Sequence, residues 1–224
     1  MKRIDLNADV GEGCDDAALM PYLTSANVAA GGHTGDDDTI ARTVALAQQH
    51  GVAVGAHPSY PDRAQFGRVA MELEADVLTR AVAEQLQRVR RIAGALHHVK
   101  LHGALYHRAA ESLDVAQAVV RALDERTLVV GPPGALLLKL AREAGHDTAV
   151  EAFADRAYEP DGKLRARSLP GALITDPDLA AAQAVLLAPT AQTLCVHSDT
   201  PNAAAIAAAV RARLLAEGFR VTPR

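Results

Sequence analysis

The sequence alternates between two kinds of segment, and this alternation limits the fold more than any other feature. Short apolar runs rich in β-forming residues cover residues 3–10, 27–31, 52–56, 98–101, 127–130, 148–152 and 193–196. Between them lie segments with the apolar spacing of helices, at residues 37–50, 74–92, 114–123, 135–144, 178–187 and 202–217. Strands separated by helices pair in parallel through right-handed crossovers, which predicts the α/β class. Both a doubly wound open sheet and a closed barrel fit this pattern.

Polar side chains follow nearly every expected strand, and their position favours the closed barrel. Asp9 and Glu12 come after the first strand, and Lys100 and His102 end the fourth. A barrel brings the carboxyl ends of all its strands to one mouth, whereas an open sheet spreads them along a line. We therefore expect residues 1–224 to form one domain, a seven-unit TIM-like (β/α) barrel. The other strand-end residues are Asn27, His33, His57, Glu151, Asp155, His197 and Asp199.

Composition argues against partnership with nucleic acid or a membrane. The formal net charge is -4 and 3% of the residues are aromatic, so the chain lacks both a basic field and a set of stacking platforms. No apolar run reaches the roughly 18 residues of a membrane span, and the first residues contain no signal-peptide core. We expect a cytoplasmic protein in which Cys14 and Cys195 are ordinary reduced thiols. Self-association stays open.

The first expected strand contains the motif DLNADVGEG, in which polar residues alternate with apolar ones. This alternation places Asp5, Asn7 and Asp9 on one side of the strand, and Glu12 lies in the turn that follows. In a barrel that side faces the lumen, where a buried carboxylate needs a cation, a metal ion or a proton. The simpler alternative is a solvated edge strand with capping acids.

Two further motifs place imidazole and guanidinium groups after strands. SANVAAGGHTGDDD combines two glycines, which would let a ligand approach the backbone, with His33; a plain glycine turn and helix cap is the alternative. In GAHPSYPDRAQFGR, the following proline holds His57 in extended geometry. Arg63 and Arg68 in the same motif suit a carboxylate or phosphate, although either arginine alone would indicate only a solvated surface.

The motif KLHGALY brings an amine and an imidazole to one face of a strand end. Lys100 and His102 at this place could hold a phosphoryl group or polarise a carbonyl. Lone histidines are usually satisfied core or surface residues, and we expect this of His50, His97, His98, His107 and His146.

Two motifs close to the C-terminus add further charged groups. EAFADRAY supplies Glu151, Asp155 and Arg156, and a long connection after it contains Arg167. CVHSDT supplies His197 and Asp199 ahead of the last helix, whose N-terminus offers free backbone donors to an anion. The sequence has no GxxxxGK[ST] phosphate loop, so ATP would bind without that cradle.

Seven motifs in this order resemble the LamB/YcsF family, the 5-oxoprolinase A subunits, across essentially the whole chain. They are DLNADVGEG, SANVAAGGHTGDDD, GAHPSYPDRAQFGR, KLHGALY, EAFADRAY, RSLPGALITDP and CVHSDTP. The resemblance implies a (β/α)7 barrel of the glycoside hydrolase/deacetylase type and ATP-dependent hydrolysis of 5-oxoproline to glutamate. It also implies separate B and C subunits as partners, ATP as cosubstrate and Mg²⁺ accompanying the ATP.

The chain departs from the family pattern at three places. The family usually reads CGFHAGDP where this chain has AGGHTGDD, and HGD where it has HSD. It also normally has an extra stretch before the last strand, where residues 187–190 of this chain run almost directly into the strand. We expect this shortening to affect a loop near the site or a partner surface.

A second resemblance, to metal-dependent carbohydrate deacetylases of the YdjC type, concerns a metal ion. In those enzymes an aspartate after the first strand and two strand-end histidines hold a divalent ion, and Asp9, His57 and His102 have comparable positions here. The same three residues could instead bind phosphate or the lactam directly.

The hypothesis from these resemblances is phosphorylation of the lactam oxygen followed by displacement by water. Its catalytic residues are Asp9, Glu12, His57, Lys100 and His102, and its substrate- or nucleotide-binding residues are Asn7, Asn27, His33, Arg68, Glu151, Asp155, Arg156, Arg167, His197 and Asp199. Two alternatives stay open: an amidohydrolase or deacetylase that needs a divalent metal but no partner, and a non-catalytic binding subunit of a multisubunit hydrolase.

Overall fold

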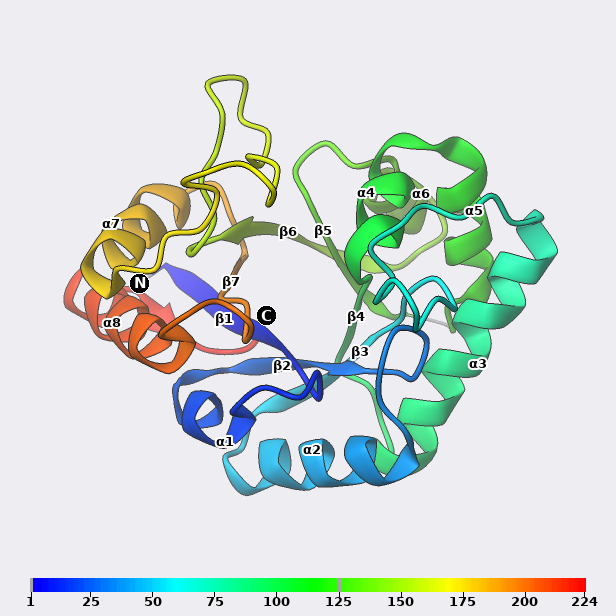
Figure 1. The fold of residues 1–224 in the computed structure, drawn as a ribbon, viewed down its shortest axis with the longest axis horizontal. Helices are drawn as coiled ribbons and strands as arrows, with labels where there is room; N and C mark the ends of the chain where they lie inside the picture. Colours follow the sequence, from blue (N-terminus) through cyan, green and yellow to red (C-terminus); the bar gives the residue numbers. More distant parts are fainter. Residues whose placement is uncertain (1, 125) are drawn as a thin grey trace.

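Parallel strands close into a seven-stranded barrel in the computed structural model, which describes residues 2–124 and 126–224 (Figure 1). Neighbouring strands follow the chain order, and the ring closes because β1 pairs with both β2 and β7. The open-sheet alternative is therefore wrong. The barrel strands are β1 (Arg3–Val10), β2 (Ser25–Ala29), β3 (Ala53–His57), β4 (His98–Lys100), β5 (Leu128–Gly131), β6 (Asp147–Phe153) and β7 (Thr193–Cys195).

Helices form an outer ring around the barrel (Figure 1). The ring contains α2 (Asp37–Gln49), α3 (Ala75–Ala93), α5 (Leu113–Ala122), α6 (Leu136–Glu143), α7 (Pro177–Leu187) and α8 (Ala203–Ala216), all within two residues of their expected bounds. The sequence interpretation missed the short α1 (Asp16–Leu19), the 3₁₀ turn η1 (Met20–Tyr22), α4 (Gly103–Glu111) and the two-residue strand β8 (Arg220–Val221). Within the described residues, no helix combines the length and the apolar character needed to cross a bilayer.

Strand β1 shows why the lumen is polar. Its apolar side chains, such as Leu6 and Val10, are fully buried against the surrounding elements, while Asp5, Asn7 and Asp9 on its other face are 5%, 2% and 7% exposed. A strand paired on both sides and buried on both faces is not a solvated edge strand, so that alternative is wrong.

The buried polar groups of the lumen satisfy one another. Asp5 accepts hydrogen bonds from the hydroxyl groups of Thr24, Ser25 and Thr193, each at 2.6 Å. Burial raises the pKa of Asp5, although these hydroxyl groups act in the opposite direction. Gly55 leaves space for the His98 ring, because a Cβ at this position would lie 2.3 Å from His98 Nε2. The lower lumen is thus filled by side chains that hydrogen-bond to one another.

Two long connections lie at the carboxyl ends of the strands. Residues 58–74 join β3 to α3, and residues 154–176 join β6 to α7 with antiparallel bridges between Arg156 and Leu173 and between Tyr158 and Leu164. The short connection of residues 188–192 enters β7 at its amino end, which is the opposite face of the barrel. The shortened segment therefore lies away from the mouth. Of the two expected effects, a change in a loop near the site is wrong, and a change in a partner surface stays a prediction.

Candidate active site

A cavity of about 300 Å³ opens at the carboxyl ends of the barrel strands. Its lining includes ten of the residues expected from the sequence: Asp9, Glu12, His57, Arg68, Lys100, His102, Arg156, Arg167, His197 and Asp199. The other five, Asn7, Asn27, His33, Glu151 and Asp155, do not line the cavity but hydrogen-bond to residues that do or to one another. The structure thus brings all fifteen expected residues into one connected region.

Lys100 lies at the centre of the cavity floor and is 2% exposed. Its Nζ is 2.9 Å from Asp9 Oδ1, 3.0 Å from Glu151 Oε1 and 3.1 Å from Cys195 Sγ. Burial would lower the pKa of this amine, but the negative charge of Asp9 outweighs it with smaller contributions from Cys195 and Glu151, and the pKa rises well above its usual value. Lys100 is therefore a charged ammonium between two acids, Asp9, which lines the cavity, and Glu151, which does not.

Asp9 is the acid at the cavity surface. Its Oδ1 accepts a hydrogen bond from Asn27 Nδ2 at 2.8 Å, and its Oδ2 is 3.4 Å from His57 Nε2. Burial would raise the pKa of Asp9, but His57 and Lys100 together lower it well below its usual range. Asp9 is thus an ionised, oriented carboxylate able to accept a hydrogen bond from a ligand or a water molecule.

Glu12 contacts three histidines from the turn after β1. Its Oε1 is 2.8 Å from His33 Nε2, 3.3 Å from His102 Nδ1 and 3.8 Å from His57 Nε2. The rings of His33 and His102 stack with centroids 3.7 Å apart. Burial opposes ionisation of Glu12, yet the hydrogen bonds from His102 and His33 hold its pKa far below the usual range.

The backbone holds the rings of His57 and His102 in defined orientations. His57 Nδ1 is 2.8 Å from the Lys100 carbonyl oxygen, and His102 Nε2 is 3.0 Å from the Phe66 carbonyl oxygen. Because a carbonyl oxygen only accepts, each of these nitrogens bears the proton. The two remaining nitrogens face each other at 3.0 Å, so they share either a proton or an ion.

Glu12, His57 and His102 suit a divalent metal ion. Their three free atoms are separated by 3.0, 3.3 and 3.8 Å, as expected around an ion with bonds of about 2.0–2.2 Å. A backbone carbonyl that holds the far nitrogen of each ring is a usual outer contact of metal-binding histidines. The trio expected from the sequence was Asp9, His57 and His102. In the structure Glu12 contacts both imidazoles, whereas Asp9 contacts only the His57 imidazole of the two.

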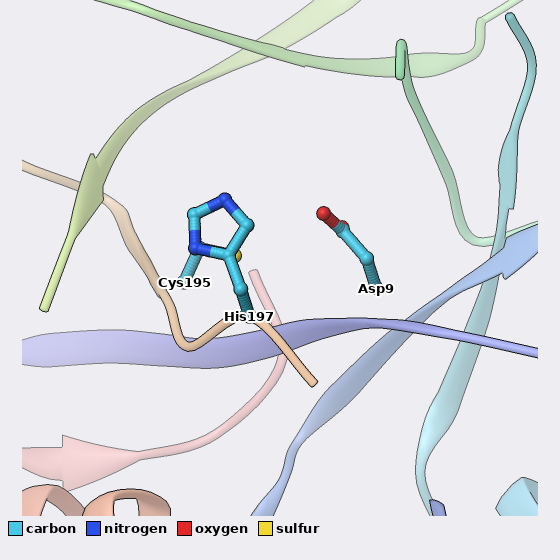
Figure 2. Close-up of side chains that lie close together, drawn as sticks. All are labelled: Asp9, Cys195 and His197. Carbon is cyan, nitrogen blue, oxygen red and sulfur yellow. The ribbon is translucent and has the colours of Figure 1, made fainter. Parts of the chain in front are cut away.

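A second group of potential metal ligands consists of Asp9, Cys195 and His197, whose candidate atoms lie within 4.8 Å of one another. Figure 2 shows Asp9 and His197 projecting side by side from β1 and from the segment after β7. However, Lys100 Nζ already occupies the space between Asp9 and Cys195, at 2.9 and 3.1 Å. A cation at this place opposes a metal ion, so this group does not fit one.

His197 is positioned by the buried Asp155. Asp155 accepts from the His197 ring at 3.0 Å, from the His197 backbone N–H at 3.0 Å and from the Thr200 hydroxyl at 2.5 Å. Burial would raise the pKa of Asp155, but His197 and Thr200 lower it. Because Nδ1 of His197 is held by Asp155 and its ring stacks on Phe153 at 5.1 Å, Nε2 is the nitrogen left for the cavity.

The upper wall of the cavity is formed by arginines of the two long connections. Asp199 forms a two-point ion pair with Arg167, at 2.6 and 2.9 Å. Its Oδ2 also accepts a hydrogen bond from Arg68 Nη2 at 2.8 Å. These contacts join residues 58–74 to residues 154–176 across the mouth. Burial would raise the pKa of Asp199, but Arg167, together with His197 and Arg68, lowers it.

The sequence interpretation missed several residues of the site. Tyr106 lines the cavity and donates to Glu151 Oε2 at 2.9 Å, while Phe153 forms part of the wall. His107, expected to be an ordinary residue, also lines the cavity. Cys195 was expected to be an ordinary thiol, but its sulfur contacts Lys100. The sequence contained one signal for Cys195. It is two residues before His197, as Asn7 is two residues before Asp9, so both pairs place their side chains on one side of a strand.

Comparison with known proteins assigns the family. Residues 4–224 match the LamB/YcsF family. The chain belongs to this family. Among its relatives, the 5-oxoprolinase A subunit of Heliobacterium modesticaldum is 43% identical over 247 residues, covering 98% of this chain and 97% of that protein. The 5-oxoprolinase A subunit of Methylococcus capsulatus is also 43% identical, covering 98% of this chain and 95% of that protein.

Two solved structures support the same fold. The crystal structure of the lactam utilization protein from Thermus thermophilus superposes with a TM-score of 0.92 at 38% identity, covering 99% of this chain and all of that one. A peptidoglycan deacetylase from Bdellovibrio bacteriovorus has a TM-score of 0.57 at 13% identity, covering 99% of this chain and 51% of that one, and shows only a shared fold. The alignments to LamB/YcsF relatives are longer than the 224 residues of this chain, so the relatives contain residues that it lacks.

Acidification to pH 5 should destabilise the protein through His98, which lies beneath the cavity. Burial, together with the charge of His97, lowers the pKa of His98 to about 3. Below about pH 6.5, His98 therefore binds a proton in the unfolded chain but not in the folded chain. The free energy of unfolding falls as pH drops from 7 towards 3. From this residue alone we expect a loss of about 2 kcal/mol in the free energy of unfolding between pH 7 and 5.

Urea denaturation of the wild type and of His98→Gln at both pH values measures this effect. The loss between pH 7 and 5 should be clearly smaller in His98→Gln, with His50→Gln, at the exposed end of α2, as the control. Depressed carboxylate pKa values contribute mainly below this window. An equal loss in His98→Gln and the wild type would contradict the assignment.

Proposed function

We propose that this chain is the A subunit of an ATP-dependent 5-oxoprolinase that acts with B and C subunits. The reaction converts 5-oxo-L-proline to L-glutamate and couples it to hydrolysis of ATP to ADP and phosphate. The names of the relatives, the 5-oxoprolinase A subunits and the lactam utilization protein, support this proposal. The observation on which it depends most is the buried Lys100–Asp9 pair at the floor of a small cavity, flanked by His57.

The chemistry of the substrate explains the need for ATP. An unstrained five-membered lactam is stable near neutral pH, so opening it requires an activated form. Phosphorylation of the lactam oxygen activates the carbonyl carbon for attack by water. The C–N bond then breaks, which opens the ring to an acyl phosphate with a free amine, and a second water molecule releases phosphate to give glutamate. In this scheme Lys100 stabilises negative charge on the carbonyl or phosphoryl oxygen. Asp9 orients the attacking water and accepts its hydrogen bond.

A divalent ion held by Glu12, His57 and His102 would act as a Lewis acid on an oxygen of the substrate or of water. Independently of an ion, the carbonyl contacts of His57 and His102 keep their rings in place. Glu12 and Asp9 supply negative charge on two sides of His57. Burial would lower the pKa of His57, but Asp9 and Glu12 raise it, so His57 can hold a proton beside the reacting atoms.

The cluster of Glu12, His57 and His102 also favours a second candidate function, an amidohydrolase that uses a metal ion and neither ATP nor partners. This candidate predicts stoichiometric zinc or another divalent ion in the purified chain, and ATP-independent cleavage of amides. A non-catalytic binding role is disfavoured by the dense set of buried ionised groups around the cavity, since such groups are typical of active sites.

The deciding experiment measures ADP release stimulated by 5-oxoproline, with the chain alone and with the B and C proteins added. We expect stimulation only with all three proteins present. Stimulation by B and C without this chain would refute its part in the reaction. If 5-oxoproline stimulates no ADP release under any condition, the proposed function as a whole is refuted. Amide cleavage without ATP would support the second candidate function.

A further inference from the structure

One cation of the cavity wall has no acidic partner. Among the cavity-lining cations, Lys100 pairs with Asp9, Arg68 and Arg167 pair with Asp199, and Arg165 pairs with Glu159. Within residues 2–124 and 126–224, Arg156 forms no salt bridge, although its residue is only 7% exposed. A guanidinium remains charged at any ordinary pH, so Arg156 is a buried positive charge that no carboxylate of the described residues meets at salt-bridge distance.

The backbone nevertheless holds Arg156 in a defined orientation. Its Nη2 donates to the Arg165 carbonyl oxygen at 2.8 Å, and its Nε lies 3.4 Å from the Ala172 carbonyl oxygen. Across the described part of the chain, Nη1 has no protein acceptor, although the side chain lines the cavity. Burial and the nearby Arg167 lower the pKa of Arg156, and Asp155 and Asp199, neither of which forms a salt bridge with it, offset this only in part. A buried charge is costly unless it meets an opposite charge, so an anionic ligand in the cavity would complete the pairing.

The surroundings of Arg156 restrict what this ligand can be. Phe153, three residues earlier, forms a ring surface in the same cavity, and Lys100 Nζ lies 5.4 Å from the centre of that ring. The whole cavity measures about 300 Å³. A guanidinium, an aromatic surface and a buried ammonium in so small a space suit a compact molecule with an anionic group close to a polar carbonyl.

The geometry points to Arg156 as the binding residue for the carboxylate of the substrate, with the lactam carbonyl directed towards Lys100. This inference rests on the proposed function, and it specifies the substrate class as a cyclic amide with a carboxylate beside the ring. In 5-oxoproline the carboxylate is on the carbon bonded to the lactam nitrogen, so one small molecule presents both groups. Arg156 would then select acids over neutral lactams of the same shape.

The test compares binding of 5-oxoproline and of its neutral carboxamide to the full chain by isothermal titration calorimetry. The wild type should prefer the acid. In Arg156→Met, the dissociation constant for 5-oxoproline should rise on the order of 100-fold, while that for the carboxamide stays nearly unchanged. Arg156→Lys keeps the charge but loses the planar guanidinium and its backbone contacts, so its dissociation constant for 5-oxoproline should lie between those of the wild type and Arg156→Met. Lys163→Met, which removes a positive charge from the exposed part of the same loop, is the matched control.

Circular dichroism and a thermal melt establish that each variant is folded. Equal affinity of Arg156→Met and the wild type for 5-oxoproline would overturn the inference. So would equal wild-type affinity for acid and carboxamide, no wild-type binding of 5-oxoproline, or a loss in Arg156→Met confined to ATP, which would assign the guanidinium to a nucleotide phosphate. The wild type could prefer the acid and Arg156→Met lose this preference while the three-protein mixture shows no 5-oxoproline-stimulated ADP release. In that case the inference stands and the proposed function fails.

Discussion

Lys100→Met should destabilise the protein by about 3–5 kcal/mol, the size expected when one member of a buried ion pair is removed. Methionine fills much of the same volume, so the main loss is charge. Asp9 and Glu151, which contact Lys100 Nζ at 2.9 and 3.0 Å, would be left as two buried carboxylates without their cation. Urea denaturation monitored by circular dichroism measures the difference in free energy of unfolding.

The pH dependence of this loss identifies its cause. Burial would raise the pKa of Asp9, and Lys100 is one of the two main charges that oppose it. Without Lys100, the folded-state pKa of Asp9 should lie above its unfolded value, so the destabilisation should be largest at neutral pH and shrink as pH falls and this carboxylate takes up a proton. Lys139→Met removes an exposed amine 4.0 Å from Glu143 on α6 and should change stability by less than about 0.5 kcal/mol. A similar small change in Lys100→Met would show that the buried pair is not formed.

Asp9→Asn should reduce 5-oxoproline-stimulated ADP release by the three-protein mixture by about 10³-fold. Asparagine keeps the size of the side chain and can still accept from Asn27, whose Nδ2 is 2.8 Å from Asp9 Oδ1. It lacks the negative charge that faces Lys100 and His57 and that orients the attacking water. The loss should appear mainly in kcat, because the proposed role of Asp9 concerns the attacking water.

Folding and complex assembly should survive this change, because Glu151 still contacts Lys100. Size-exclusion chromatography with the B and C proteins tests assembly. Asp147→Asn, at the exposed amino end of β6, is the control and should retain full activity. Activity of Asp9→Asn within tenfold of the wild type would remove Asp9 from the mechanism.

The barrel could be predicted from the sequence because two independent patterns agreed. Alternating strands and helices required parallel pairing, and polar residues after nearly every strand required a shared mouth. The second strand was placed two residues late, since Ser25 and Ala26 pair with Asn7 and Ala8 and belong to β2. The elements α1, η1 and β8 span two to four residues each, too few to show a period.

The pairing of charges at the site could not be predicted, because it depends on backbone direction in loops. Glu12 reaches His33 and His102 from a turn in which Gly11 and Gly13 both adopt positive φ, of 77° and 85°. No sequence spacing indicates that Glu12, more than Asp9, would lie between two imidazoles. Likewise, Asp199 joins Arg68 to Arg167 across two connections that are far apart in sequence.

Strand β8 pairs in parallel with the amino end of β1, with Arg3 opposite Arg220 and Ile4 opposite Val221. The first and last strands of the chain therefore meet at the amino end of β1, on the barrel face opposite the cavity. A short glycine-rich linker could join them, and new ends could be opened in the turn between α2 and β3. Such a circular permutant should keep its catalytic mouth intact, and affinity tags or fluorescent fusions attached at the native ends would leave substrate entry unobstructed.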